Sequence, residues 1–323
     1  MAMRADDMID RRRLRRKLTF WRVVALAIAA IGLASAAAWL LRDFGGTAVD
    51  HIAKVRIEGT ITEDEELLER LKRIRESNSV KGVILSIDSP GGTTAGGEAI
   101  FDAVRELAAA KPVVAQVGTL AASAGYMIAS ASDHIVARKS SIVGSIGVLV
   151  QFPDITGLMD KIGVKLEEVK SSPLKAEPSP FNPTTDEERA MVRSMILDSY
   201  DWFVGLVAER RPLTRSEVAA LADGSIFTGR QALQKKLVDE LGGESEAIGW
   251  LSTKGVRGDL EVVEWKARNG GWFLSSEALA GAVARLVGLP DHGAALFKQF
   301  GGERLFLDGL LSVWQPEKSV WDD

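Results

Sequence analysis

Residues 112–126 read Pro112-Val-Val-Ala-Gln-Val-Gly-Thr-Leu-Ala-Ala-Ser-Ala-Gly-Tyr126, and this stretch decides the fold. A β-branched run comes first, and small residues around Ser123 then lead into a helical pattern. An earlier segment has the same order, because Val83-Ile-Leu-Ser-Ile87 precedes a glycine-rich turn, Asp88-Ser-Pro-Gly-Gly92, and another helical pattern. We therefore predict two neighbouring parallel strands whose turns meet at the carboxyl edge of one sheet.

The two turns together offer the parts of an acyl-transfer site. Attack on a carbonyl needs an activated oxygen and donors aimed where negative charge develops, and here a serine hydroxyl would meet free backbone N–H groups. The small neighbours Ala122, Ala124 and Gly125 are expected to leave the Ser123 hydroxyl unshielded. The alternative is that Ser123 only caps the following helix, which is a common role for serine.

A base for the serine is harder to find. None of the three histidines, His51, His134 and His292, stands where a catalytic triad would need it. Lysine is the remaining candidate, and Lys175 lies in the apolar, proline-containing segment Pro173-Leu-Lys-Ala. A lysine acts as a base only where burial or nearby positive charge favours the neutral amine. The alternative is an ordinary solvated loop lysine.

Composition limits the other function classes. The chain has 323 residues, which is enough for a large core, and a net charge of −4 gives no general argument for nucleic-acid binding. It has no cysteine, so disulfides, thiol catalysis and thiolate metal sites are excluded. We expect no metal and no cofactor.

The amino-terminal region predicts a membrane anchor. Residues 23–41 carry no charge and nearly reach the roughly 20 residues that cross a bilayer. A basic cluster at residues 11–17 precedes them, so the positive-inside rule predicts a cytoplasmic tail at 1–19, a transmembrane helix at 20–41 and a linker at 42–51. The catalytic domain would then be periplasmic, on a single-pass protein of the inner membrane. A cleaved signal peptide is the alternative.

The rest of the chain alternates between strand and helix patterns, which predicts an α/β fold with a mostly parallel sheet. We expect one catalytic domain at 52–257 and a C-terminal region without an assigned role at 258–323. Thr185 and Glu188 have the spacing of a capping box at the start of a long helix. The expected strands are 52–57, 82–87, 113–117, 134–137, 165–169 and 260–265, and the expected helices are 63–76, 98–110, 123–132, 186–210 and 213–221, with two further helical stretches after residue 265.

Five motifs in order give the chain a specific resemblance. They are Asp88–Gly92, Ala122–Ala129, Ala131–Ile135, Gly144–Val148 and the Lys170-Ser-x-x-x-Lys175 segment. Together they resemble the signal peptide peptidase A family, membrane-anchored Ser/Lys peptidases of family S49 with a crotonase-like fold similar to the caseinolytic protease subunit. The likeness covers about residues 52–243 and one copy of each motif, as in the short, single-repeat members.

The resemblance implies roles for individual residues. Ser123 would be the nucleophile, Lys175 the general base, and backbone N–H groups near Gly91, Gly92 and Ser123 itself the oxyanion hole. Short members form a homo-oligomeric ring in which the lysine comes from a neighbouring subunit, and their substrates are remnant signal peptides or other membrane-derived peptides. This chain departs from the pattern at Ala124, where glycine is common.

Two other functions remain open at this point. A catalytically idle membrane scaffold could keep the same fold. A crotonase-type acyl-CoA hydratase is the other alternative, and the predicted anchor argues against it because coenzyme A thioesters are cytoplasmic.

Overall fold

The computed structural model describes residues 19–33, 49–267 and 311–313. The chain divides into two units, Met1–Val49 and Asp50–Asp323. In the first unit, residues 19–33 form a helix whose side chains are exposed except for the half-buried Val24. Across the described ranges, no helix is both long and apolar enough to cross a membrane. Residues 34–41 of the expected span and the basic tail at 1–18 lie outside the described residues, so the anchor stays a prediction.

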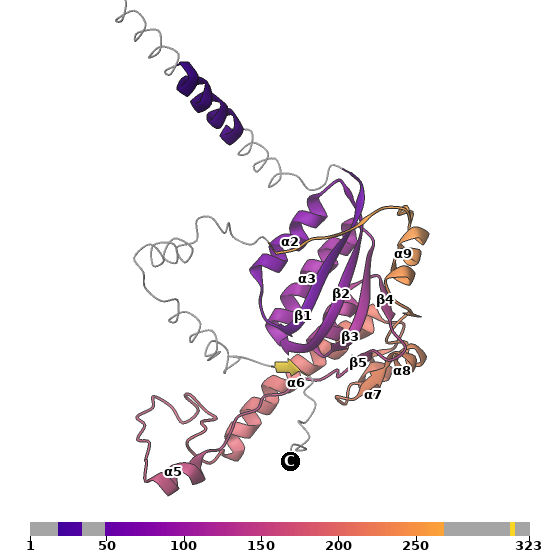
Figure 1. Ribbon diagram of the computed structural model, residues 1–323. Coiled ribbons are helices and arrows are strands. Elements are labelled where there is room, and N and C mark those ends of the chain that lie inside the picture. The colour runs from indigo at the N-terminus through magenta and orange to yellow at the C-terminus, as the bar shows by residue number, and fades with distance from the viewer. Residues whose placement is uncertain (1–18, 34–48, 268–310, 314–323) are drawn as a thin grey trace, which may run out of the picture. The chain divides into compact units, whose positions relative to one another are not determined.

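The second unit is built on one mixed sheet (Figure 1). Its central strands run in the order β6-β5-β3-β2-β1-β8, with β4 beside β3, β7 beside β4 and β9 beside β2. The pairings are parallel except β5 with β6 and β2 with β9. The strands are β1 (His51–Ile61), β2 (Val80–Thr93), β3 (Val113–Ala122), β4 (His134–Ala137), β5 (Ile142–Gly144), β6 (Ile226–Thr228), β7 (Glu240–Leu241), β8 (Val262–Glu264) and β9 (Leu311–Val313).

The five helices predicted between residues 63 and 221 are present, and three further helices, Thr156–Ile162, Gly229–Gln234 and Glu244–Thr253, were not predicted. The capping box of the longest one is confirmed, since Thr185 Oγ1 accepts from the N–H of Glu188 at 3.3 Å and the Glu188 carboxylate accepts from the N–H of Thr185 at 3.2 Å. The helices are α2 (Glu65–Glu76), α3 (Thr94–Ala110), α4 (Ala124–Ala131), α5 (Thr156–Ile162), α6 (Asp186–Arg210), α7 (Arg215–Leu221), α8 (Gly229–Gln234) and α9 (Glu244–Thr253).

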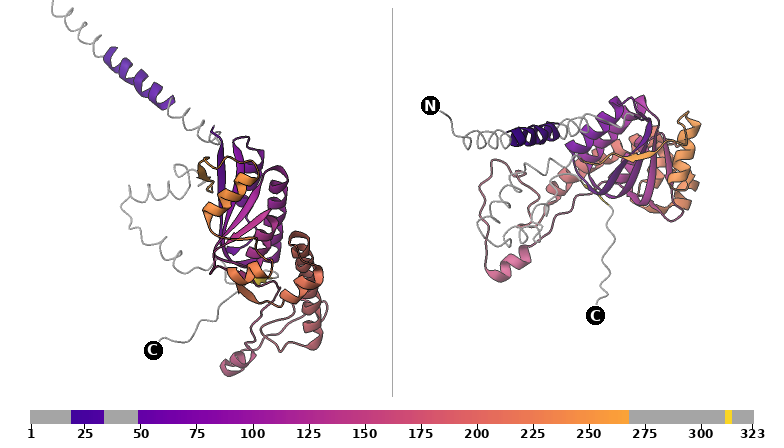
Figure 2. Two further views of the ribbon diagram at one scale, coloured as in Figure 1. Left: turned by 90° about the vertical axis from the view of Figure 1, so that its right-hand side faces the viewer. Right: turned by 45° about the horizontal axis from the view of Figure 1, so that its top comes forward.

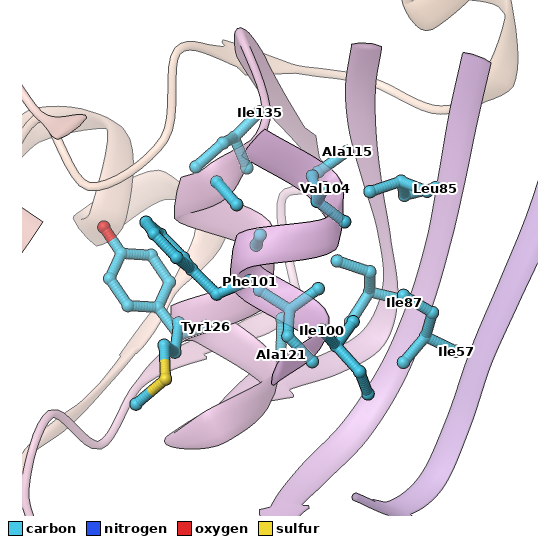
Figure 3. Packing of buried hydrophobic residues seen from close by; sticks show 14 of the residues in the cluster. Ile57, Leu85, Ile87, Ile100, Phe101, Val104, Ala115, Ala121, Tyr126 and Ile135 are labelled. Carbon is cyan, nitrogen blue, oxygen red and sulfur yellow. The ribbon is translucent and has the colours of Figure 1, made fainter. Parts of the chain in front are cut away.

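Both faces of the sheet are covered, which explains why its central strands are apolar at consecutive positions. On one face, Leu85 and Ile87 of β2 belong to a core with Ile100 and Val104 of α3, as Figure 3 shows. On the other face, residues such as Ile84 pack with α9 in a smaller cluster. The burial of successive residues on opposite faces holds β2 and β3 in register at the centre of the domain.

The Asp88–Gly92 segment is not the turn that its composition predicts. It continues β2 as an extended strand, and α3 begins only at Thr94. The reason is its close approach to β1, because a Cβ built at Gly92 would lie 1.8 Å from the carbonyl oxygen of Ile61. Glycine here lets two backbones meet rather than letting the chain reverse.

The strand predicted at residues 165–169 is wrong. These residues have no regular structure and are exposed, and no strand of the described part of the chain lies beside them. The strand predicted at 260–265 is confirmed as β8, which pairs with β1. Both helical stretches predicted after residue 265 lie outside the described residues. Residues 311–313, which the structure does describe, form the strand β9.

One part of the domain extends away from the sheet. Figures 1 and 2 show α5, the loop after it and the first half of α6 projecting from the body as an arm, here defined as residues 155–197. Its side chains include many exposed large apolar ones: Leu158, Ile162, Val164, Leu166, Val169, Phe181, Met191, Met195 and Leu197. An exposed apolar cluster of this kind is typical of an interaction surface.

Candidate active site

Ser123 stands at the junction between β3 and α4 in a strained backbone conformation. Its φ is 57° and its ψ is −120°, a region that residues other than glycine rarely adopt. Strain of this kind persists only where the surroundings impose it, and a sharp strand-to-helix turn is a known way to present a nucleophile. The Ser123 side chain makes no capping hydrogen bond to α4. The capping alternative therefore lacks the bond that would define it.

Neighbouring backbone holds this junction in place. The N–H of Ser123 donates to the carbonyl oxygen of Gly144 in β5 at 2.8 Å, and its carbonyl accepts from the N–H of Met127 at 2.9 Å. On the other side, a Cβ at Gly125 would lie 2.9 Å from the carbonyl oxygen of Ser89. The start of α4 therefore sits directly on β2, and only a residue without a side chain fits at that contact.

The sheet brings the two predicted segments together. Ser89 of β2 pairs with Ala121 of β3, so the glycines of β2 lie beside the turn at Ser123. The N–H of Gly91 donates to Ser89 Oγ at 3.1 Å, and Gly92 pairs with Ile61 of β1 and with β9. The N–H of Ser123 is engaged by Gly144, as described above. The assignment of Gly91 and Gly92 to an oxyanion hole stays a prediction.

The hydroxyl is not as open as its small neighbours predict. Ser123 is 1% exposed, and Ala122, Ala124 and Gly125 are buried as well. The prediction of an unshielded hydroxyl is therefore wrong for this structure. The small residues around Ser123 leave room for other atoms to come close to it. In the folded chain, other parts of the protein occupy that room.

Lys175 lies in the loop between α5 and α6, within the arm. Its side chain is exposed, and the described residues provide it with no ion pair or side-chain hydrogen bond. Lys170 in the same loop differs, because its Nζ contacts Glu168 at 2.5 Å and also Glu177. Lys170 donates hydrogen bonds to the carboxylates of Glu168 and Glu177, and these bonds raise the pKa of Lys170. Lys170 is therefore held as a cation, which leaves Lys175 as the better candidate for a base.

The histidines have other contacts. His51 stacks on Trp265 and accepts a hydrogen bond from its indole N–H at 3.0 Å. His134 stacks on Trp250 and hydrogen-bonds the carboxylate of Glu240 at 3.2 Å. His292 lies outside the described residues. The described residues also contain no cluster of histidine and carboxylate side chains that could hold a metal ion.

A buried polar cluster beneath α4 went unnoticed in the sequence. The Tyr126 hydroxyl donates to the carbonyl oxygen of Leu237 at 2.9 Å, and burial raises the pKa of Tyr126. Arg211 donates to both carboxylate oxygens of Asp239, at 2.7 and 2.9 Å. Burial raises the pKa of Asp239, but its bonds to Arg211 outweigh this and lower it overall. The cluster joins α4 to the end of α6 and the segment before β7.

Replacing Asp239 with asparagine should destabilise the domain, because Arg211 would remain buried without its counter-charge. We expect about 2 kcal/mol at pH 7, less than for a fully enclosed pair because the Asp239 side chain keeps 25% exposure. A carboxylate whose pKa is lowered on folding stabilises above its unfolded pKa of about 3.9 and loses this effect as pH falls through the folded pKa. Urea unfolding of both proteins should show a difference that shrinks below pH 4.

The control is Asp259→Asn, which removes a carboxylate from the exposed ion pair with Arg257. This change should cost less than about 0.5 kcal/mol at pH 7. If the difference in unfolding free energy between wild type and Asp239→Asn stays constant down to pH 2, the Asp239 carboxylate is not the group that stabilises Arg211.

Two sequence models of known protein families match the part of the chain that contains this candidate site. The sequence model of peptidase family S49 matches residues 105–256, which include β3, α4 and the arm. The sequence model of the Clp protease family matches residues 50–143, which include β1 to β5 up to Val143. The second match agrees with the α/β fold and the mostly parallel sheet described above.

Individual relatives extend the likeness over more of the chain. A provisionally named signal peptide peptidase SppA of Enterococcus faecium is 32% identical over 277 residues, 79% of this chain and 79% of its own length. A provisionally named protease of Methanocaldococcus jannaschii is 41% identical over 60% of this chain and 63% of its own length. Protease 4 of Haemophilus influenzae is 37% identical over 62% of this chain. The matched part covers 34% of that longer protein. Given a strained serine at a strand-to-helix turn and relatives that match across most of its length, the chain belongs to peptidase family S49.

Proposed function

We propose that the protein is a membrane-anchored serine endopeptidase that works with a Ser123/Lys175 dyad and without a cofactor. The observation that carries the proposal is the strained backbone of Ser123, which has no capping bond to account for it and lies beside the glycine pair of β2. Membership of family S49 supports hydrolysis of peptides over the idle scaffold and the acyl-CoA hydratase.

The chemistry follows from these groups. The neutral amine of Lys175 takes the proton from Ser123 Oγ while Oγ bonds to the carbonyl carbon of the substrate. Backbone N–H groups near Gly91 and Gly92 would stabilise the oxyanion that forms. The lysine ammonium then returns the proton to the leaving amine as the C–N bond breaks. Water attacks the acyl-enzyme in the same way, and Ser123 recovers its proton.

The position of Lys175 favours a dyad shared between subunits. Its side chain is exposed and unpaired in the described part of one chain, whereas a lysine base needs a desolvated setting. The arm that carries it also exposes the large apolar side chains listed above. A second copy of this chain would cover that surface and could place Lys175 near the Ser123 of its neighbour. Repetition of such a head-to-tail contact builds a ring where the rotation between subunits closes, and we propose a closed homo-oligomeric ring.

Mixing two inactive proteins tests this arrangement. Chains with Ser123→Ala and chains with Lys175→Ala are dissociated, mixed and reassembled, and peptide hydrolysis is measured. We expect partial recovery of activity, up to about a quarter of the wild-type value for random pairing, because some interfaces then join an intact serine to an intact lysine. Each variant reassembled alone is the control. Mixed assemblies that form but stay inactive would mean that each chain builds its own dyad.

The anchor and the substrate class complete the proposal. The uncharged run at residues 23–41 supports attachment to the inner membrane with the catalytic domain in the periplasm. A protease at the membrane surface meets peptides that remain there after secretion, and one relative carries the name of a signal peptide peptidase. Remnant signal peptides and other membrane-derived peptides are therefore the substrates that we propose.

A further inference from the structure

We propose that Arg105 and Arg210 are positioning residues for Ser123. They hold the carboxyl-terminal end of α4 and, because this helix is short, they also hold the turn at its other end, where Ser123 lies. The inference rests on the proposed peptidase function for its consequence, which is the rate of the step at Ser123 Oγ. It rests on the hydrogen bonds around α4 for its geometry.

Two arginines from different helices bind the last carbonyl groups of α4. Arg105 of α3 donates from Nη1 to the carbonyl oxygen of Ala131 at 2.6 Å. Arg210, the last residue of α6, donates from Nε to the carbonyl oxygen of Ser130 at 3.2 Å and from Nη2 to that of Ser132 at 3.1 Å. The last carbonyls of a helix have no partner within the helix, and the helix dipole favours cations at this end. Three consecutive carbonyls are thus held by two side chains.

The loop after α4 is fixed at the same place. The N–H of Asp133 donates to the carbonyl oxygen of Val113 at 2.9 Å, and the Asp133 carboxylate accepts from the N–H of Val113 at 3.1 Å. The same carboxylate lies 3.7 Å from Nη1 of Arg105. Val113 is the first residue of β3, the strand that leads to Ser123. The end of α4 is therefore tied back to the start of the strand that precedes the turn.

Electrostatic stability does not explain why the two arginines meet here. Burial lowers the pKa of Arg210, the charge of Arg105 lowers it further, and Asp133 offsets this only in part. A lowered pKa means that the cation is less stable in the folded chain than in water, so this placement of Arg210 costs free energy. The contact therefore points to a geometric role for the arginines.

The short helix transmits the contact to Ser123. α4 has eight residues, so it is about 12 Å long and moves as one piece. Its first turn lies against β2, where a Cβ at Gly125 would be 2.9 Å from the carbonyl oxygen of Ser89. The φ of 57° at Ser123 persists only while the surroundings impose it. A helix that is held at both ends cannot shift to relieve this strain, so the arginines keep Ser123 Oγ in place.

Kinetics for each active site test the proposal on the full chain. We compare wild type with Arg210→Met and Arg105→Met, which keep a long side chain and remove the donors. Arg210→Met should lower kcat and the second-order rate of fluorophosphonate labelling about tenfold or more, since a small misplacement of a reacting group has an effect of that size. KM should change less than about twofold, because the lost interaction acts on the reacting atom rather than on peptide binding.

A conservative variant adds a second readout. Arg105 binds a single carbonyl, that of Ala131, and a lysine at this position keeps a cationic donor for it. Arg105→Lys should therefore recover most of the rate that Arg105→Met loses. If Arg105→Lys is as slow as Arg105→Met, the bond to the end of α4 is not what sets the rate.

Lys111→Met is the matched control. Lys111 Nζ donates to the carbonyl oxygens of Ser77 and Val80 at 2.6 and 2.9 Å, so this cation binds backbone carbonyls between α2 and β2 rather than at α4. The variant should lower Tm, as the arginine variants do, and should leave kcat and the labelling rate of each site unchanged. Wild-type kcat per site in both Arg210→Met and Arg105→Met would overturn the proposal and leave the peptidase intact.

Hydrogen exchange measures the same contact without any reaction. The N–H of Met127 donates to the carbonyl oxygen of Ser123 at 2.9 Å in the first turn of α4. Mass spectrometry of peptides from α4 should show faster exchange in Arg210→Met than in Lys111→Met and wild type, because the helix opens locally once its end is released. This result in a chain that neither hydrolyses peptides nor reacts with the fluorophosphonate would support the contact and overturn the peptidase. Equal exchange in Arg210→Met and Lys111→Met would overturn the role of Arg210 itself.

Discussion

Alanine at Ser123 is expected to lower peptide hydrolysis at least about 10³-fold, and alanine at Lys175 to do the same, because the two groups act as a unit. Removal of the hydroxyl removes the atom that attacks, and removal of the amine leaves Oγ with its proton. The measurement is turnover of a fluorogenic peptide library, with products identified by mass spectrometry. Labelling by a fluorophosphonate reports on Ser123 directly and should disappear in Ser123→Ala.

Two controls match these substitutions. Ser130→Ala removes a hydroxyl from the same helix, where it donates to the carbonyl oxygen of Met127 at 2.7 Å. Lys170→Ala removes the neighbouring lysine, which is ion-paired with Glu168. Both variants should retain most of their activity. A dead Lys170→Ala beside an active Lys175→Ala would move the base to Lys170, and a wild-type chain that never reacts with the fluorophosphonate would favour the scaffold or the hydratase.

Alanine at Gly92 is expected to destabilise the domain by about 3 kcal/mol or more, because overpacking against rigid backbone cannot be relieved by a rotamer change. The added Cβ would lie 1.8 Å from the carbonyl oxygen of Ile61, so β1 and β2 would have to separate. Thermal unfolding followed by circular dichroism should show a fall in Tm of at least about 6 °C for a domain of this size. Hydrolysis should be lost as well, since Gly92 lies on the strand beside Ser123.

Gly249→Ala is the matched control. Gly249 lies inside α9, and a Cβ there meets nothing within 4 Å. Alanine is the better helix former by up to about 1 kcal/mol, so Tm should stay constant or rise slightly. A Gly92→Ala protein that unfolds at the wild-type temperature would show that β1 and β2 can part at this point without cost.

Much of the fold could be predicted from local pattern. The β-branched runs became β2 and β3 because they are apolar on both faces, and the sheet covers both faces. The long helix α6 begins where the capping box predicts, since Thr185 and Glu188 satisfy each other's backbone without help from elsewhere. These signals act between residues that are close in the sequence, so the rest of the folded chain has little effect on the structure they produce.

Predictions failed where a distant neighbour decided the conformation. Residues 165–169 were predicted as a strand, but in the described part of the chain no strand lies beside them. The Pro-Gly-Gly sequence of β2 reads as a turn, yet the carbonyl of Ile61 occupies the space that a side chain would need and keeps the segment extended. Tyr126, Arg211 and Asp239 gave no signal because their contacts join residues that are far apart in the chain.

By itself, the sequence determined the mostly parallel α/β architecture and the exclusion of thiol chemistry, and it singled out Ser123 as the candidate nucleophile, because each depends on residue type or short-range pattern. Only the tertiary structure decided that Ser123 is strained and closed to solvent, and that β9 pairs with the end of β2. Strand register and backbone strain arise where segments that are distant in the sequence pair with one another. They depend on several segments together, so the pattern of any one segment does not reveal them.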